Sequence, residues 1–241
     1  MWFADREPWR REAEISCLKS GAVKEGRSVA IIKAIDGPGA CGVDYPVRVA
    51  ALGETALVSF AEESTTARPV AVAPAATLAC PLVSVLDRFV NDSVQPAAAR
   101  WFGQPVVGIK QISAYSCRGM NSDSNAQISE HAFGNALDIA AFTLADGRTI
   151  TVKDGWQGAP EEQGFLHDVQ GAACTLFTTV LAPGSDANHY DHMHVDLMRR
   201  SSGHVICQPA AIPGEAASFR AGGHYSGARH AEVAGPATAR R

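Results

Sequence analysis

An aspartate in apolar surroundings follows a histidine in the segment SEHAFGNALDIAAF, residues 129–142. Asp138 lies between Leu137 and Ile139, so its carboxylate is expected inside the protein. A buried carboxylate needs a partner. His131 lies seven positions earlier. The two side chains could share a metal ion, because imidazole nitrogens and carboxylate oxygens both bind zinc.

A second segment, HYDHMHVDL, adds histidines in a pattern typical of a strand. Polar and apolar residues alternate from His192 to Leu197, which is the two-residue period of a half-buried strand. His192, His194 and Asp196 are therefore expected on one face, with the apolar residues on the other. Two imidazoles aligned on a rigid strand favour a metal site.

The two segments could form one site if His131 lies in a loop that enters the strand holding Asp138. On a helix the two residues would lie about 10.5 Å apart along the axis, at about 1.5 Å per residue. Zinc bonds are only about 2.0–2.2 Å long. Gly134 and Asn135 would permit the bend. One histidine of the His-x-His strand would complete three protein ligands and leave a fourth position for water, as in catalytic zinc sites.

The elements around these residues predict an α+β fold, with a small, mainly antiparallel sheet that carries the zinc site and packs against helices. Apolar residues at helical spacing indicate helices after Pro81, from Pro96 and over residues 161–181. Alternating and β-branched runs indicate strands. They lie at 106–116, 136–143 and 148–153, the last two as a hairpin, with shorter strands within 28–60 and a connector at 61–79.

The domain organisation is expected to be one folded unit with extensions. We predict an N-terminal segment at 1–16 and a domain over 17–207, divided into an N-terminal subregion (17–76) and a zinc-site core (77–207). Residues 208–241 are rich in Ala, Gly, Pro and Arg. Because they offer few large apolar side chains to offset the entropy of ordering, we expect a disordered C-terminal tail.

Charge and hydropathy exclude two classes of partner. The 241 residues carry a formal net charge of -4. Surfaces that bind nucleic acid are strongly basic, so no nucleic-acid partner is expected. No stretch approaches about 20 uninterrupted apolar residues, so no membrane span is expected in this sequence.

Six dispersed cysteines favour disulfides, with reduced and buried thiols as the alternative. Three precede residue 81 and three follow residue 116, so complete pairing must join the two halves of the chain. Disulfides imply a periplasmic or secreted protein. The first 17 residues lack the apolar run of a signal peptide, so export would require a different start or an upstream segment.

The spacing Ser129-x-His131-x-x-Gly134-x-Ala136-x-Asp138, followed by His192-x-His194, resembles the motif set of a zinc metallopeptidase superfamily. This superfamily includes lysostaphin, the D-Ala-D-Ala carboxypeptidases and dipeptidases, and Hedgehog domains. The wider pattern resembles the extensin-like protein C-terminal domain family over roughly residues 15–208. Its matching pieces include SAYSCRGMN, DGRTITV, FLHDVQGAACTLF and HYDHMHVDL.

The resemblance implies a zinc-dependent hydrolase that cleaves an amide bond in peptidoglycan peptides. His131, Asp138 and His194 would bind zinc, which would polarise the scissile carbonyl. His192 would lie beside the metal and stabilise charge or carry a proton. Arg118 would hold a substrate carboxylate or carbonyl through its planar fork of donors.

One departure from the superfamily pattern concerns the catalytic base. Its dipeptidases place a glutamate three residues before the last histidine ligand, whereas this chain has Asp191 there. The aspartate is one methylene shorter, which favours His192 as the assisting group. The alternative to an enzyme is a non-catalytic module of the same fold that binds cell wall and keeps zinc, because fold and metal do not guarantee turnover.

Other polar and aromatic residues near these motifs have competing interpretations. His189 could replace His131 as a ligand, but strand parity favours a loop position at the rim of the cleft. Asp196 is expected to orient a histidine ligand. The remaining expectations are a solvated carboxylate for Glu130, surface or interhelical positions for His167 and His204, and either packing or a glycan groove for Trp101 and Trp156.

Overall fold

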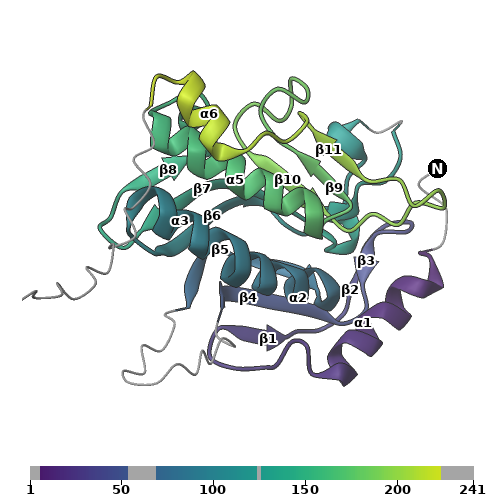
Figure 1. Cartoon of the computed structure of the whole chain (residues 1–241). Helices are drawn as coiled ribbons and strands as arrows, with labels where there is room; N and C mark the ends of the chain where they lie inside the picture. Colours follow the sequence, from purple (N-terminus) through teal and green to yellow (C-terminus); the bar gives the residue numbers. More distant parts are fainter. Residues whose placement is uncertain (1–5, 54–68, 124–125, 224–241) are drawn as a thin grey trace, which may run out of the picture.

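The computed structural model describes residues 6–53, 69–123 and 126–223 (Figure 1). Its helices are α1 (Pro8–Ser20), α2 (Cys80–Phe89), α3 (Gln95–Phe102), α4 (Val152–Gly155), α5 (Pro160–Leu176) and α6 (Gly214–Arg220), with a π-helical turn η1 (Val90–Val94) and 3-10 turns η2 (Met120–Ser122) and η3 (Glu130–Phe133). Its strands are β1 (Val29–Ile31), β2 (Ile35–Asp36), β3 (Gly42–Val43), β4 (Pro46–Leu52), β5 (Val70–Ala79), β6 (Val106–Ser113), β7 (Ala136–Leu144), β8 (Thr149–Thr151), β9 (Thr179–Leu181), β10 (Met193–Asp196) and β11 (Ile206–Gln208).

The main sheet confirms the α+β class and is larger than expected. Among the described residues it has nine strands in the order β1-β4-β5-β6-β7-β10-β9-β11, with β8 beside β7. Most neighbours are antiparallel, whereas β5 with β6 and β9 with β11 are parallel. The predicted hairpin of β7 and β8 is present. The sheet is large because the strands of the N-terminal subregion pair with the rest through β5 instead of forming a separate unit.

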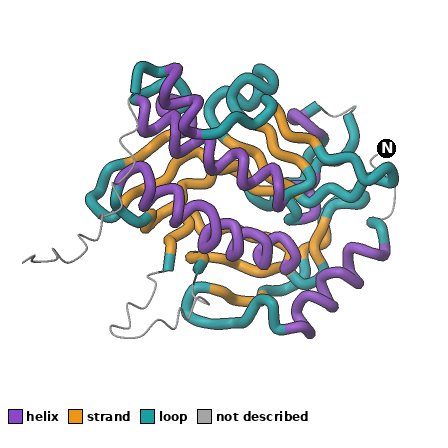
Figure 2. Tube along the Cα trace, in the orientation of Figure 1, coloured by secondary structure: helices purple, strands orange, loops and turns teal. Residues whose placement is uncertain are grey.

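A helical layer of α2, α3 and α5 covers one face of this sheet (Figures 1 and 2). In α2, Pro81 occupies the first turn, where a missing N–H does no harm. Leu82, Leu86 and Phe89 recur at helical spacing, and all three are buried. These side chains belong to one hydrophobic core together with residues of α5 and the strands. The helices therefore close one face of the sheet and leave the opposite face for other contacts.

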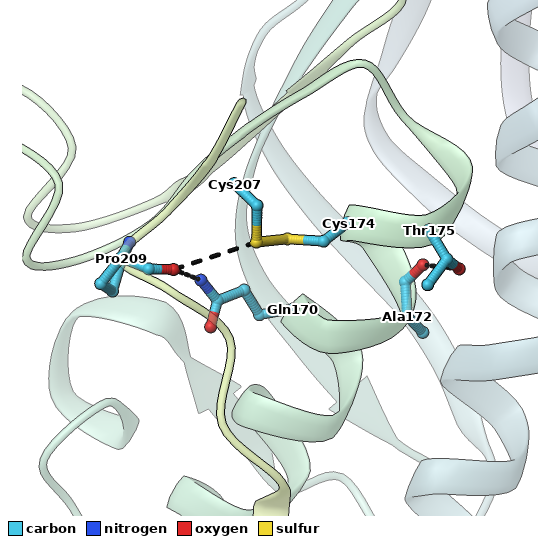
Figure 3. The surroundings of a disulfide bond; sticks show 6 residues. All are labelled: Gln170, Ala172, Cys174, Thr175, Cys207 and Pro209. Atoms are coloured by element: carbon cyan, nitrogen blue, oxygen red, sulfur yellow. Dashed lines mark hydrogen bonds between the residues drawn. A yellow bond between two sulfur atoms is a disulfide. The ribbon is translucent and has the colours of Figure 1, made fainter. Parts of the chain in front are cut away.

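Three disulfides hold this fold together, and all six cysteines take part. Cys17–Cys80 joins α1 to α2, and Cys41–Cys117 joins the two halves of the chain, as the distribution of cysteines predicted. Cys174–Cys207 joins α5 to β11, where Gln170 also donates a hydrogen bond to the carbonyl of Pro209 at 2.7 Å (Figure 3).

The disulfides also bear on where the protein resides. They span 63, 76 and 33 residues. In the chain-entropy model, cross-links of such spans each stabilise the fold by about 3–4.5 kcal/mol. Bonds of this kind persist in a non-reducing compartment, such as the periplasm or the cell exterior. Within the described ranges, no helix has the length and apolar character needed to cross a membrane.

Several of the predicted element boundaries are wrong. The strands expected at 106–116 and 148–153 end at Ser113 and Thr151, and α4 begins at Val152. The helix expected over 161–181 ends at Leu176. Phe177 is extended, and Val180 belongs to β9, where it pairs with β10 and β11. Thr179 and Val180 are β-branched and favour a strand, although Val180 continues the helical spacing of the residues before it. The connector expected at 61–79 is a strand from Val70 onward, and its first part lies outside the described residues.

Two predicted domain boundaries fall inside elements of the structure, one in α1 and one in β11. The division between 16 and 17 falls inside α1, which runs from Pro8 to Ser20 as one helix. The tail expected from 208 is folded up to residue 223, and its α6 packs against α5. Gly214 makes this possible, because a Cβ there would meet the backbone oxygen of Gly164 at 2.1 Å. Its N–H also donates to Asp168 at 2.8 Å. Residues 224–241 lie outside the described part.

A buried carboxylate in α1 makes stability depend on pH. Burial raises the pKa of Glu14 to about 7, although its Oε2 accepts the N–H of Tyr45 at 2.6 Å. The folded state therefore holds a proton that the unfolded state releases near its ordinary pKa of 4.5, and this contribution to stability is lost as pH rises from about 4.5 to 7.

Replacing Glu14 with glutamine is expected to raise the free energy of unfolding at pH 8 by about 1–2 kcal/mol, after allowance for solvent screening. The glutamine keeps an acceptor for Tyr45 without the charge. At pH 4, where the carboxyl is protonated in both states, the difference should vanish. Urea unfolding of both proteins at the two pH values measures it; a gain at pH 4 equal to that at pH 8 would contradict the explanation.

Candidate metal centre

The face of the sheet opposite the helical layer carries the predicted ligands. In β7, Leu137 and Ile139 belong to the core beneath the helices, so Asp138 between them points the other way. In β10, Met193 and Val195 also belong to this core, so His194 between them points to the same side of the sheet as Asp138. The two strands are antiparallel, with His194 directly opposite Asp138. The period-two prediction for this strand is confirmed.

His131 reaches the same point from the 3-10 turn η3, which precedes β7. Ser129 caps this turn by accepting the N–H of His131, and Gly134 ends it in the left-handed region at φ 61. A Cβ on Gly134 would also lie 3.0 Å from the backbone nitrogen of Ala79, so glycine is needed both for the bend and for the close approach. The predicted loop entry of His131 into the β7 strand is therefore confirmed.

Three donor atoms meet at one place. His131 Nε2 lies 3.1 Å from Asp138 Oδ2 and 3.2 Å from His194 Nδ1, and His194 Nδ1 lies 2.8 Å from Asp138 Oδ1. All three residues are buried, and together they form a group that could hold a metal ion. Tetrahedral ligands with bonds of about 2.1 Å stand about 3.4 Å apart, so a small shift would fit them around zinc.

The outer ring nitrogens are held in the manner of metal-binding histidines. His131 Nδ1 lies 2.7 Å from the carbonyl of Ala114, which can only accept, so Nδ1 carries a proton and Nε2 is the ring nitrogen that faces Asp138. His194 Nε2 lies 3.0 Å from Asp196 Oδ2. The expected contact between Asp196 and His194 is therefore present, and the role of Asp196 in orienting a metal ligand stays a prediction. Backbone and carboxylate partners thus aim both inner nitrogens at Asp138.

Charge is concentrated around this centre. Burial opposes ionisation of Asp138, yet hydrogen bonds from His131 and His194 outweigh it and hold the pKa of the carboxyl well below its usual range. Burial likewise opposes protonation of His194, but its bonds to Asp138 and Asp196 raise the pKa of the ring to about 9. Metal binding at His194 must therefore displace a proton.

His192 and Asp191 lie beside the three ligands. His192 Nδ1 lies 2.9 Å from Asp191 Oδ1, and its Nε2 lies 3.7 Å from Asp138 Oδ1. The aspartate accepts from Nδ1 and fixes the ring with Nε2 turned toward the centre. Asp191 therefore contacts the histidine, and among the described contacts it has none with the three ligands.

Arg118 approaches the centre from the loop after β6. Its Nη2 donates to Ser113 Oγ at 3.1 Å and lies 3.5 Å from Asp138 Oδ2. The neighbouring disulfide Cys41–Cys117 fixes the start of this loop. The side chain is 28% exposed, so part of the guanidinium faces solvent.

Five of the six predicted site residues line an open cavity of about 750 Å³. Asp191 is the one that does not. His189 also lines it and is buried, with its ring centroid 5.1 Å from that of His192. Its Nδ1 lies 2.9 Å from Asp186. Burial lowers the pKa of His189 despite this partner. His189 lies in a loop, as expected, because β10 begins only at Met193, but its side chain is buried in the cavity wall rather than placed at the rim.

A family model described as "Extensin-like protein C-terminus" matches residues 15–208. The chain belongs to this family. Searches of curated proteins and of solved structures found no match. The matched range of the extensin-like chain contains the three candidate ligands, His192 and Arg118, and it begins within α1.

Glu130 of the extensin-like chain is not the solvated carboxylate that its loop position predicted. It is 3% exposed and pairs with Arg10, which lies 120 residues earlier. No local pattern in the sequence could reveal a partner so distant. Asp186 and the carbonyl of Ala114 were missed for the same reason, because each acts through a loop whose path depends on tertiary contacts.

The remaining candidates lie away from the cavity. Trp156 is buried and packs against His167 in a tilted arrangement, with ring centroids 4.4 Å apart. Trp101 donates from Nε1 to Asp168 at 2.7 Å. His204 is exposed, as expected. Neither tryptophan lines the cavity, so packing rather than a glycan groove accounts for both.

Proposed function

We propose that this extensin-like protein is a zinc-dependent hydrolase that cleaves an amide bond in peptidoglycan peptides, and that it is related to the zinc metallopeptidase superfamily whose motifs it resembles. The observation that carries the proposal is the convergence of His131 Nε2, Asp138 and His194 Nδ1 within 2.8–3.2 Å of one another at the cavity. His192 beside them supplies a group that a purely structural metal site does not need.

Zinc is the metal that this donor set favours. Two imidazoles and one carboxylate are nitrogen and oxygen ligands of the kind that zinc accepts, and three protein ligands with a fourth open position are typical of catalytic zinc. A zinc ion held there would act as a Lewis acid and polarise an amide carbonyl. Calcium would require more oxygen ligands than this centre offers.

The neighbouring side chains have separate roles in the proposal. His192, held by Asp191 through Nδ1, presents Nε2 to the reacting group and can give or take a proton. Asp191 is a positioning residue for this ring. Arg118 offers the exposed part of its guanidinium to a substrate carboxylate or carbonyl, because its planar fork matches such groups.

The cavity wall favours a peptide as substrate over a sugar chain. Of the described residues that line it, none is Phe, Tyr or Trp, the side chains on which sugar rings commonly stack. Toward β9 and β11 the wall includes the apolar side chains of Leu181, Met198 and Ile206, with polar residues such as Thr179 and Gln208 beside them. Aliphatic side chains of a peptide would pack there.

Two arginines at opposite sides of the centre support an anionic peptide. Ser113, Asp138, His194 and Leu181 are cross-strand neighbours on β6, β7, β10 and β9. Arg118 bonds to the first of these strands, and Arg200 bonds to Thr179 on the last at 2.8 Å. Three strand spacings, about 14 Å in all, separate β6 from β9, and this is the length of about four extended residues. Peptidoglycan peptides carry carboxylates and aliphatic side chains within that length.

Release of peptides from purified peptidoglycan tests the proposal. The zinc-loaded protein is expected to release new amino groups and peptide fragments, detected by mass spectrometry. Treatment with a chelator should abolish release, and added zinc should restore it. Metal-dependent binding to peptidoglycan without any cleavage would overturn the hydrolase and favour the non-catalytic binding module instead.

A further inference from the structure

We propose that Arg10 is a positioning residue of the metal centre: helix α1 holds the turn that presents His131, through a buried ion pair with Glu130. This inference rests on the metal site of the proposed function and does not require hydrolysis. Arg10 precedes residue 15, where the match to the family begins, so it adds a part to the centre from outside the matched range.

The ion pair has two parallel hydrogen bonds. Arg10 Nη1 donates to Glu130 Oε2 and Nη2 to Oε1, both at 2.8 Å. The arginine is 8% exposed and the glutamate 3%. Bidentate pairs fix the direction as well as the distance of the carboxylate, so this contact restrains how Glu130 is turned. Such restraint passes along the backbone to the next residue, His131.

Glu130 also holds both ends of the turn. Its Oε2 accepts Asn135 Nδ2 at 2.6 Å, and its backbone oxygen accepts the Asn135 N–H at 3.0 Å. The guanidinium of Arg10 lies over the ring of Phe133, 3.7 Å from the centroid. Arg10 thus contacts two side chains of the turn, Glu130 and Phe133, and His131 lies between them in the chain.

Helix α1 is itself firmly placed. Its Cys17 is bonded to Cys80 of α2, and Glu14 accepts the N–H of Tyr45. Arg10 Nε additionally donates to Glu7, the N-cap residue of α1, at 2.7 Å. Because the helix is fixed by contacts independent of the metal ligands, it can serve as a rigid support for η3 instead of following its movements.

The test compares zinc affinity and Co²⁺ absorption spectra of the full chain with those of Arg10→Met and Arg10→Lys. Outer partners of metal ligands are worth about 10–100-fold in affinity. We expect Arg10→Met to weaken zinc binding by about 10–100-fold and to change the Co²⁺ spectrum, which reports on the ligand geometry. Arg10→Lys keeps the charge but loses the fork, so a smaller loss is expected.

Val83→Ala serves as the matched control for a general loss of stability. Val83 lies in α2 and is 1% exposed. It belongs to the core on the helix-covered face of the sheet, away from the metal centre. The Val83→Ala substitution should lower the unfolding midpoint while it leaves the zinc affinity and the Co²⁺ spectrum unchanged. If Arg10→Met fails to fold, the zinc affinity and Co²⁺ spectrum of Arg10→Lys test the proposal instead. Wild-type affinity and spectrum in the folded arginine variants would overturn the proposal, as would a wild-type protein that binds no metal; absence of hydrolysis alone would leave it intact.

Discussion

Replacing Asp138 with asparagine is expected to lower zinc affinity by about 100-fold or more, and hydrolysis should fall with it. The substitution removes the negative charge of the carboxylate that both His131 and His194 contact, while it keeps the shape of the side chain. It also removes the partner that bonds His194 Nδ1 at 2.8 Å. Competition with a chromophoric chelator measures the affinity, and amino-group release from peptidoglycan measures the reaction.

Asp92→Asn is the control for this experiment, because Asp92 is exposed in η1 and lies outside the cavity lining. It removes the same charge without touching the centre and should leave zinc affinity unchanged. Equal affinities for Asp138→Asn and wild type would show that the carboxylate is not a ligand.

His192→Gln is expected to reduce hydrolysis by about 100- to 10,000-fold while zinc still binds, because general acid–base groups contribute about that much to rate. His192 is not one of the three candidate ligands, and its Nε2 lies 3.7 Å from Asp138 Oδ1. Asp191→Asn should give a smaller loss, since it acts only by orienting the ring through the 2.9 Å contact. Rates at saturating zinc and measured metal content separate catalysis from binding.

His204→Gln, at an exposed position, controls for the loss of an imidazole and should keep full activity. Two results would count against the assigned role of His192. One is a rate within a few fold of wild type, which would transfer the role to another group, with His189 the nearest candidate at 5.1 Å between ring centroids. The other is loss of zinc, which would make His192 a ligand.

The parts of the site that were predictable from sequence are those with local periodicity. Alternation from Met193 to Asp196 placed His194 and Asp196 on one face, and the apolar neighbours of Asp138 placed it on a strand. Gly134 marked the bend that brings His131 inward. In each case a few adjacent residues decide the local geometry, so their pattern carries the information.

What the sequence did not reveal depends on contacts between distant segments. Glu130 is polar and lies in a turn, and it becomes buried because Arg10 comes to it from another helix. Residues 214–220 have few large apolar side chains, and they fold because α5 offers them a surface. Val180 has the spacing of the helix before it, and sheet pairing with β10 and β11 overrides that spacing. Local propensity is too weak to decide any of these cases.

Anomalous diffraction at the zinc absorption edge, from crystals of the purified protein, tests the central claim most directly. We predict one strong peak within about 2.0–2.2 Å of His131 Nε2, an oxygen of Asp138 and His194 Nδ1. A fully loaded protein whose peak lies elsewhere, or a protein that takes up no zinc in the presence of excess metal, would contradict the account.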